Sequence, residues 1–573
     1  MNMEMRLIEC VPNFSEGRDD KVISAITDAI KSVGGVKLLD VDPGVSTNRT
    51  VVTFVGEPEA ALEAAFQAIK TAQQLIDMRK HSGVHPRMGA TDVCPFVPVS
   101  GVTMAECTKL AERLGQRVGE ELKIPVYLYA NSARRSDRQS LADIRKGEYE
   151  ALPQKMEDPN FKPDFGPVQF NAQSGATVIG ARPFLIAYNV NLNTKSKKLA
   201  NEIALNIREA GRAEKGPDGA ILKDKDGVSV KKPGLLKACR AVGWYVDEYE
   251  RAQISINLID SSVTSMHHAF DACCKQAEEL GLRVTGSEIV GLVPLSAMLD
   301  AGRHYLARQG RSTGVSEQEL VTTAIQSLGL ADLAPFDPQN KIIEYKVRTA
   351  ETLLIKKTVA DFLDELASES PAPGGGSVSA LCGALSASLT AMVANLSYEK
   401  KGLEKYRPHM QATAVRAQEL KQKLARAVDN DMQAFNKIID ARRLPKATPE
   451  EIEARGSALF AANKEAVNVP LQVLQDCSEL IDLASVVVKD GNQNSLSDAG
   501  CAVLNAVAAA EGAFMNVLIN LAGFAKDGDE GLFRDQSGRT AALAIASVRQ
   551  TSSSLKVTIL GRLEDDLVLS TVS

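Results

Sequence analysis

The sequence predicts an α+β fold in which two sheet-and-helix subdomains precede an all-helical bundle. Strand-like and helix-like segments alternate over the first two-thirds of the chain, a similar order of segments recurs after about residue 184, and strand signals fade beyond about residue 350. A chain of 573 residues also exceeds what one hydrophobic core usually supports, so several folding units are expected.

The first subdomain is predicted over residues 1–184. Strand patterns occur in LIECVPNF, VKLLDVD and TNRTVVTFVG. Between the first two of these, apolar residues recur at helical spacing and predict a helix: Val22, Ile23, Ile26, Ile30 and Val33.

The second subdomain is predicted over residues 185–346. Its expected elements, in order, are a strand in FLIAYNVNL, a helix near Ala200–Glu209, a hairpin of ACRAVGWYV and AQISINLID, a helix from Met266 to Leu280, and a strand in SEIVGLVP. The intervening segment EKGPDGAILKDKDGVSVKKPG is rich in glycine, proline and charge, which predicts a long exposed loop.

A linker at residues 347–356 and an all-helical domain at residues 357–573 are predicted next. Thr448 supplies an N-cap, with Pro449 and Glu451 at the first and third helical positions. The small residues of SALCGALSASLTAMVANL favour close helix packing over a membrane span and suit a subunit interface, so an oligomer is expected. Other helices are expected at Val378–Leu396, Pro408–Arg442, Asp498–Phe524 and Ser537–Leu567.

The composition indicates a folded protein with no net positive charge, so any anion must be bound by a local patch. Apolar residues make up 44% of the chain, and the formal charge of −6 provides no net field that would attract nucleic acid or an anionic membrane. Nine cysteines without a C-x-x-C pair fit a reduced environment. Glu4 and Arg6 interrupt the first apolar run, so no signal peptide is expected and a cytoplasmic location is predicted.

The stretch HSGVHPRMGATDVCPF is the first candidate site. His81 and His85 have the i, i+4 spacing of zinc helices, but Gly83 and Pro86 disfavour a helix and no glutamate accompanies the pair, so no metal is expected. Cys94 adjoins an apolar run, where a buried and inert thiol is the common outcome.

The histidines of this stretch lie next to Arg87, a residue type well shaped to clamp a carboxylate. Two surface histidines on a polar loop explain the same residues equally well. The residues alone therefore leave a functional and a structural interpretation open.

The helix at Pro408–Arg442 contains a second candidate. Its apolar stripe runs through Leu420, Leu424, Val428, Phe435 and Ile438, and Asp431 occupies the free slot on that face. Burial there would raise the pKa of the carboxyl towards the range of a general acid or base, whereas a buried ion pair or a cap on a neighbouring helix is the structural alternative. Asp429 points roughly 160° away on an ideal helix and is expected to be solvated.

A third candidate is PAPGGGS, from Pro371 to Ser377, which precedes a helix. Consecutive glycines at a helix N-terminus form an anion cradle of backbone N–H groups, although a flexible hinge has the same composition. The Gly-Lys-Ser/Thr of a P-loop is absent, which argues against nucleotide binding.

Together these three stretches resemble the bifunctional folate enzyme family formimidoyltransferase-cyclodeaminase, over essentially the whole chain. The blocks that carry the resemblance are ECVPNFSEGRD, LLDVD, STNRTVVTFVGEP, LIDMRKHSGVHPRMGATDVCPFVPVSG, PDFGP, GARPFLIAYNVNL, VGWYVDE, GSEIVGLVP, IIEY, PAPGGGSVSA, RLPKATPEE and NVLINL. So many ordered blocks make a chance similarity very improbable.

The resemblance implies two reactions. The formimidoyl group passes from N-formimidoyl-L-glutamate to tetrahydrofolate with release of glutamate, and 5-formimidoyltetrahydrofolate then cyclises to 5,10-methenyltetrahydrofolate and ammonia. It also implies two ferredoxin-like subdomains in the transferase and a helical deaminase that dimerises, with active sites at subunit interfaces. Animal members of the family form a ring-like tetramer of dimers.

The resemblance assigns roles to residues of this chain. His85 is the expected transferase residue, moving a proton at N5 of tetrahydrofolate, and Asp431 is the expected deaminase acid, giving a proton to the departing amidine nitrogen. The folate-binding segment after PDFGP falls on Gly166, Pro167, Val168, Gln169, Phe170, Asn171, Ala172, Gln173, Ser174 and Gly175.

The chain departs from the family at a second folate contact, which maps to Gly234, Leu235 and Leu236. Leu235 stands where a basic residue is expected, and Lys231, Lys232 and Lys237 are the replacements suited to a polyglutamate tail. A chain that keeps only one of the two activities and a folate-binding scaffold that keeps neither are the alternatives, and the presence of both His85 and Asp431 argues against the scaffold.

Overall fold

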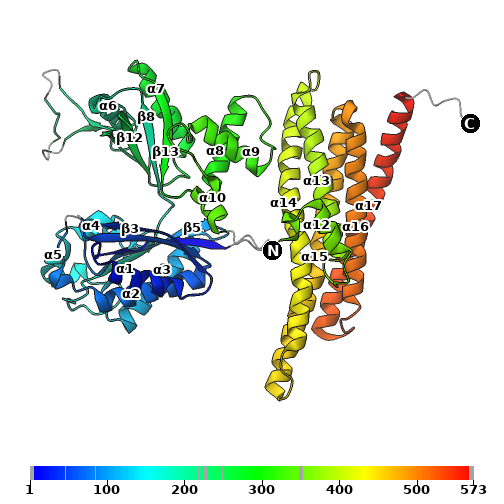
Figure 1. The fold of residues 1–573 in the computed structure, drawn as a ribbon, viewed down its shortest axis with the longest axis horizontal. Helices are drawn as coiled ribbons and strands as arrows, with labels where there is room; N and C mark the ends of the chain where they lie inside the picture. The colour runs from blue at the N-terminus through cyan, green and yellow to red at the C-terminus, as the bar shows by residue number, and fades with distance from the viewer. Residues whose placement is uncertain are drawn as a thin grey trace, which may run out of the picture. The chain divides into compact units, whose positions relative to one another are not determined.

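The computed structural model describes residues 6–45, 47–83, 86–216, 220–224, 227, 229–247, 249–347 and 353–566 (Figure 1). Contacts divide the chain into two compact units. The sheet unit comprises Met1–Met298 and Leu328–Thr349, and the helical unit comprises Leu299–Ser327 and Ala350–Ser573.

The sheet unit begins with a seven-stranded sheet in the order β3-β4-β1/β2-β5-β7-β6, in which β1 and β2 act as two pieces of one strand because both pair with β4 and β5. Counting β1/β2 once, the first four strands lie in the order second, third, first, fourth, which is the predicted ferredoxin-like arrangement. The strands are β1 (Leu7–Cys10), β2 (Asn13–Phe14), β3 (Val36–Gly44), β4 (Arg49–Gly56), β5 (Thr91–Ser100), β6 (Val126–Ala130) and β7 (Thr177–Ala181).

One face of this sheet packs against the three long helices of the subdomain. The predicted stripe is confirmed, since Ile23, Ile26 and Ile30 are buried on the first helix. The helices are α1 (Asp20–Lys31), α2 (Pro58–Leu75), α3 (Met104–Glu121), α4 (Leu141–Arg145) and α5 (Glu148–Lys155), with 3-10 turns η1 (Met78–Lys80), η2 (Ser136–Arg138) and η3 (Pro159–Phe161). A second apolar cluster joins Tyr127 and Val178 to Ile144 and Leu152 of α4 and α5.

A four-stranded sheet in the order β11-β12-β8-β13 follows and repeats the ferredoxin-like arrangement. The predicted hairpin is confirmed, with Cys239 opposite Leu258 at one end and Val246 opposite Arg251 at the other. Its elements are β8 (Ile186–Leu192), α6 (Lys197–Ile207), β11 (Cys239–Val246), β12 (Arg251–Leu258), α7 (Met266–Glu279) and β13 (Val284–Val290).

The predicted long loop carries a short pair of strands, β9 (Arg212–Ala213) and β10 (Lys231–Lys232), and its residues 217–219, 225, 226 and 228 lie outside the described residues. The remaining helices before the helical domain are α8 (Leu295–Arg308), α9 (Glu317–Leu328), α10 (Pro338–Lys341) and α11 (Ile343–Val347). Contacts group Leu299–Ser327 with the helical unit, where the Ser312 hydroxyl donates to Asn395 Oδ1 at 2.6 Å.

The helical unit is a bundle of long helices whose core is rich in alanine, valine and leucine. Each predicted helix is present, and Thr448 forms the predicted capping box with Glu451. The elements are η4 (Leu354–Lys356), α12 (Val359–Leu366), α13 (Gly375–Glu399), η5 (Glu404–Tyr406), α14 (Arg407–Arg443), α15 (Pro449–Asp490), η6 (Gln493–Ser495), α16 (Leu496–Leu521) and α17 (Gly528–Asp566).

Two segments of the described chain, Gly375–Glu399 and Gln493–Leu521, are long and apolar enough to cross a membrane by length and composition. Of their most apolar windows, 61% and 39% are buried inside the bundle. Core helices of water-soluble bundles meet the same criteria, so this is weak evidence for a membrane span.

Candidate functional sites

The loop after α2 is held in place by contacts between residues that are far apart in the sequence: Gly17, Asn48 and the segment that contains His81 and Arg87. The ring of His81 lies between two partners: its Nε2 is 2.8 Å from the carbonyl oxygen of Asn48, and its Nδ1 accepts from Arg87 Nε at 3.2 Å. Because a carbonyl only accepts and a guanidinium only donates, the proton of the neutral ring resides on Nε2. Asn48 also donates to the carbonyl of Ser82 and accepts from the backbone N–H of Gly17.

The loop passes so close to the backbone of Thr47 that position 83 must be a glycine. A Cβ atom at this position would lie 2.2 Å from the carbonyl oxygen of Thr47, which is far inside van der Waals contact. The next two residues, Val84 and His85, lie outside the described residues, so the structure does not test the position of His85.

Arg87 is buried and its guanidinium is engaged by carboxylates of its own chain. It donates to both oxygens of Glu150 at 2.7 and 2.6 Å and to Glu148 at 3.0 Å. The bond with Arg87 lowers the pKa of Glu150. Arg87 therefore binds carboxylates, as predicted for a guanidinium. These carboxylates belong to Glu148 and Glu150 of α5, and they hold Arg87 in place in the loop that joins α2 to β5.

The predicted folate segment, Gly166–Gly175, borders the same loop. Gln173 accepts from the backbone N–H of Met78 at 2.9 Å, and Ser174 accepts from that of Ala90 at 2.8 Å. The phenol of Tyr149, on α5, donates to the carbonyl of Ala172 at 2.5 Å. The predicted folate segment and α5 thus lie beside both ends of the loop that joins α2 to β5, at Met78 and Ala90.

The second predicted folate contact lies beside α6. Leu235 and Leu236 donate their backbone N–H groups to the carbonyls of Asn206 and Ile207 at 2.9 Å each, so they cap the C-terminus of α6. Leu235 is 62% exposed, and Lys231, Lys232 and Lys237 are also exposed. Among the described residues, no hydrogen bond joins this segment to Gly166–Gly175.

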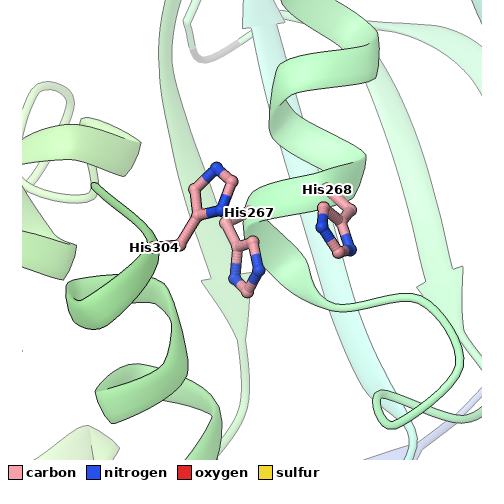
Figure 2. A group of neighbouring side chains, drawn as sticks. All are labelled: His267, His268 and His304. Carbon is pink, nitrogen blue, oxygen red and sulfur yellow. The ribbon is translucent and has the colours of Figure 1, made fainter. Parts of the chain in front are cut away.

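Cys94 is buried, as predicted, with its Sγ 3.6 Å from the Sγ of Cys10. Four other histidines lie outside the predicted sites. His267 and His268 lie in the first turn of α7 with ring centroids 4.5 Å apart, and His304 lies on α8 (Figure 2), whereas His409 lies on α14. The Oγ of Ser265 is 2.9 Å from Nε2 of His267. No pattern in the sequence singled these histidines out.

In the helical unit, the carboxylate of Asp431 lies against the first turn of α13. That helix begins at Gly375, so the glycine stretch does open a helix N-terminus. The hydroxyl of Ser377 is 3.2 Å from Asp431 Oδ2, and a Cβ atom added at Gly376 would lie 2.0 Å from Asp431 Oδ1. The anion in the predicted cradle is therefore the side chain of Asp431 itself.

Burial raises the pKa of Asp431, and bonds from the side chain and backbone of Ser377 offset only part of this effect. The hydroxyl of Ser377 also lies 2.9 Å from the carbonyl of Val428, and its one hydrogen can serve only one acceptor at a time. When it serves Val428, its lone pairs can accept a hydrogen bond from the O–H of a neutral Asp431. The site therefore suits a carboxyl that exchanges a proton.

The expectation that Asp429 is solvated is wrong. Asp429 is 3% exposed and accepts from the backbone N–H groups of Leu354 at 2.6 Å and of Ile355 at 3.5 Å. The turn η4 covers this side of α14, which the pattern of α14 alone could not reveal. Asp429 thus caps η4 while Asp431 caps α13.

Sequence reasoning also missed Glu148 and Glu150, and it included Ser377 only as the last residue of the glycine stretch. The two glutamates are far from Arg87 in sequence and carry no motif. A helical wheel of α14 predicts that Asp431 faces the bundle but not which helix terminus it meets. Asn516 was noted only within the block NVLINL, and its Nδ2 lies 3.5 Å from the Cβ position of Gly375.

Comparisons with known families cover nearly the whole chain. Residues 7–182 match the formiminotransferase domain, N-terminal subdomain; residues 187–348 match the formiminotransferase domain; and residues 358–531 match formiminotransferase-cyclodeaminase.

The chain is also similar to individual proteins. Formimidoyltransferase-cyclodeaminase of Rattus norvegicus is 44% identical over 98% of this chain and 99% of its own length. Glutamate formimidoyltransferase of Streptococcus pyogenes is 40% identical over 52% of this chain and 93% of its own length. The crystal structure of formiminotetrahydrofolate cyclodeaminase from Thermotoga maritima is 30% identical over 36% of this chain and 98% of its own, with a TM-score of 0.32.

The glutamate formimidoyltransferase, which has no cyclodeaminase part in its name, thus matches about half of the chain. The formimidoyltransferase-cyclodeaminase matches nearly all of it. The order of the matching segments agrees with the order of the two ferredoxin-like subdomains and the helical bundle. The chain belongs to the formimidoyltransferase-cyclodeaminase family.

Proposed function

We propose that the chain is a bifunctional folate enzyme of histidine degradation. It transfers the formimidoyl group from N-formimidoyl-L-glutamate to tetrahydrofolate, releasing L-glutamate. It then converts 5-formimidoyltetrahydrofolate to 5,10-methenyltetrahydrofolate and ammonia. The observation that carries the proposal is the 44% identity to a formimidoyltransferase-cyclodeaminase over 98% of the chain.

In the transferase, proposed for residues 1–184 and 185–346, His85 moves a proton at N5 of tetrahydrofolate as that atom attacks the amidine carbon. An imidazole suits this step because its ordinary pKa lies near neutrality. The neighbouring contacts of Arg87 with Glu148 and Glu150 support a loop with a fixed end, on which such a residue can be oriented.

In the deaminase, proposed for residues 357–573 after a linker at 347–356, Asp431 gives its proton to the departing amidine nitrogen. Ammonia is a far better leaving group than an amide ion, so protonation at this atom is the help that the step needs. The raised pKa of Asp431 supports the role because a proton is then held closer to neutral pH.

Several properties of the assembly belong to the same proposal. Tetrahydrofolate is the acceptor substrate, no metal takes part, and the protein acts in the cytoplasm. A homo-oligomer, at least dimeric, is supported by apolar residues that α13 and α16 leave exposed: Leu385, Met392, Leu396, Leu504, Met515, Leu518 and Ile519. On each helix these recur at helical spacing and form a stripe.

One experiment tests both reactions. Purified protein is incubated with tetrahydrofolate and formimidoylglutamate while the methenyl chromophore and free ammonia are measured. Appearance of both products supports the proposal. Glutamate release without methenyl product would show that only the transferase is retained. The absence of both products would leave a deaminase-only enzyme or a folate-binding scaffold, and ammonia release from added 5-formimidoyltetrahydrofolate distinguishes these two.

Substitutions separate the two sites. His85→Ala is expected to abolish the formimidoylglutamate-dependent step and to spare ammonia release from 5-formimidoyltetrahydrofolate. Asp431→Asn is expected to do the reverse. If either substitution in a folded protein disabled both steps, the assignment of two separate sites would be wrong.

A further inference from the structure

The block NVLINL places two asparagines four residues apart on α16, at Asn516 and Asn520. Residues at this spacing lie on the same face of a helix. Both side chains are half-buried, and both reach neighbouring helices of the bundle. The two proposed reactions give neither asparagine a role.

Asn520 anchors α16 to a gap in α15. Pro470 lies inside α15 and has no N–H, so the carbonyl of Ala466 lacks its usual donor within the helix. Nδ2 of Asn520 donates to that carbonyl at 2.7 Å. The bond satisfies the acceptor that the proline leaves, and it holds α16 against α15.

The helix α16 is also fixed against α13. A Cβ atom at Gly512 would overlap the hydroxyl of Ser379, which itself donates to the carbonyl of Gly375 at 2.7 Å. Gly512 lies one turn before Asn516, and Asn520 lies one turn after it. The backbone on both sides of Asn516 is therefore held in place, so its side chain has a defined position.

The contacts of Asn516 determine which way its amide points. Nδ2 donates to the carbonyl of Gly512 at 2.8 Å. A carbonyl oxygen can only accept, so the amide nitrogen must face Gly512 and Oδ1 must face away from it. Within the part of the chain that the structure describes, no hydrogen bond is donated to Oδ1. Asn516 therefore presents a fixed acceptor with unused capacity.

This acceptor lies at the same turn of α13 as the carboxyl of Asp431. Nδ2 of Asn516 is 3.5 Å from the Cβ position of Gly375, and the carboxyl of Asp431 meets the Cβ position of Gly376. Because both positions are glycine, no side chain of α13 stands at either of them. The helices α16 and α14 thus bring an amide acceptor and a carboxyl to consecutive positions of one helix end.

The second proposed reaction needs an acceptor beside its acid. N10 attacks the amidine carbon of 5-formimidoyltetrahydrofolate, which becomes tetrahedral, and the proton of N10 passes to the amidine nitrogen, which becomes an amino group. The bond from carbon to this amino group then breaks. Its electron pair stays on the nitrogen, which takes the proton of Asp431 and leaves as ammonia, while the lone pair of N5 forms the new C=N bond.

We propose that Asn516 is a further catalytic residue of the cyclodeamination. Its Oδ1 accepts one N–H of the departing amino group and so prevents rotation about the C–N bond. The lone pair of that nitrogen is then directed at the proton of Asp431. The inference rests on the proposed function, because it assigns a second group to the same departing nitrogen.

Two substitutions separate this role from a structural one. Asn516→Leu removes both the donor to Gly512 and the acceptor, whereas Asn516→Asp loses the donor but keeps an acceptor oxygen in the same place. The measurement is kcat for ammonia release from 5-formimidoyltetrahydrofolate. Asn516→Leu is expected to lower kcat about tenfold or more, the effect of one lost hydrogen bond, and Asn516→Asp should stay within about threefold of the wild type.

Asn505→Leu is the matched control. Asn505 lies on the same helix and makes the same kind of bond, from Nδ2 to the carbonyl of Cys501 at 2.9 Å. It is about three turns away from Asn516. The control removes an equivalent bond far from Asp431, so kcat should not change. Formimidoyl transfer and the Tm of each variant report whether the protein is folded.

The outcomes distinguish this inference from the proposed function. If the wild-type protein releases ammonia and Asn516→Leu does so at the same rate, the role of Asn516 is overturned and the function stands. Equal losses in Asn516→Leu and Asn516→Asp would overturn it too, because the missing bond to Gly512 would explain both. A wild-type protein that releases no ammonia would refute the deaminase function itself, and with it any departing nitrogen for Asn516 to orient.

Discussion

At the residue scale, the proposed catalytic role of Asp431 is linked to the stability of the helical unit. Burial raises the pKa of its carboxyl in the folded chain, so the folded state binds this proton more tightly than the unfolded state does. The contribution of the group to the free energy of unfolding is then fully present below the unfolded pKa and is lost as the pH rises through the folded pKa. At neutral pH the ionised form is a cost to folding.

Asp431→Asn is therefore expected to raise the Tm of the helical unit at pH 7 while it abolishes cyclodeamination. The gain should shrink as the pH falls below the folded pKa, where the wild-type carboxyl is itself neutral. Thermal unfolding of both proteins from pH 7 to pH 4 measures this. If the Tm of Asp431→Asn stayed below that of the wild type at every pH from 7 to 4, the hydrogen bonds of Asp431 with Ser377 would contribute more to stability than the burial of its charge costs.

Arg87 is expected to matter for stability more than its partners do. Arg87→Ala removes a buried side chain together with the donor shared by the ring of His81 and two glutamates, so it loses packing as well as the ion pairs. Glu150→Gln should cost much less, because the Glu150 side chain is 63% exposed. Urea unfolding followed by Trp244 fluorescence reports the sheet unit alone, and equal losses for both variants would contradict this ranking.

At the scale of elements, the contact between α13 and α14 depends on a glycine. A methyl group at Gly376 would meet the carboxylate of Asp431, so Gly376→Ala is expected to lower the rate of cyclodeamination at least tenfold and to leave formimidoyl transfer unchanged. Gly456→Ala on α15 is the matched control, because a Cβ atom there meets nothing within 4 Å. Equal loss of both activities would indicate general misfolding instead.

Elements were predictable wherever the information is local. The capping box at Thr448 and the apolar periodicity of α1 and α14 each depend on residues within a few turns, and the structure has these elements at the expected places. The order of strands in the two sheets is not local, and its prediction came from the family resemblance.

The same distinction explains the residues that were predicted wrongly or missed. Asp431 faces the bundle as its helical spacing indicates. Asp429 lies on a side of α14 that would be solvated if η4 did not cover it, and η4 is about 75 residues earlier in the chain. The partners of Arg87 are likewise set by the packing of α5, which no pattern around Arg87 encodes.

At the scale of the whole molecule, the exposed stripe on α16 predicts association. Ile519 is 72% exposed and Met515 is 62% exposed. Ile519→Asp is expected to shift the protein to a smaller species in size-exclusion chromatography with light scattering. Val45 is an exposed apolar residue of the sheet unit, and Val45→Asp is expected to leave the mass of the protein unchanged. An unchanged mass for both variants would show that the interface lies elsewhere.

The tail of the folate substrate provides a prediction that involves the long loop. Replacing Lys231, Lys232 and Lys237 with alanine removes three exposed positive charges. The KM for polyglutamylated tetrahydrofolate should rise more than that for the monoglutamate, and the difference should narrow at high salt because the charges are screened. Equal changes for both substrates would refute a role in tail binding.

The paired caps on α14 have a mechanical consequence. Asp429 holds the N–H groups that begin η4, and Asp431 holds the first turn of α13, on different sides of the same helix. If α14 rotated about its own axis and Asp429 left the N–H groups of η4, Asp431 would also move away from the first turn of α13. The turn η4, which leads into the helical unit, therefore helps to set the orientation of Asp431, the proposed acid of the second reaction, without touching it.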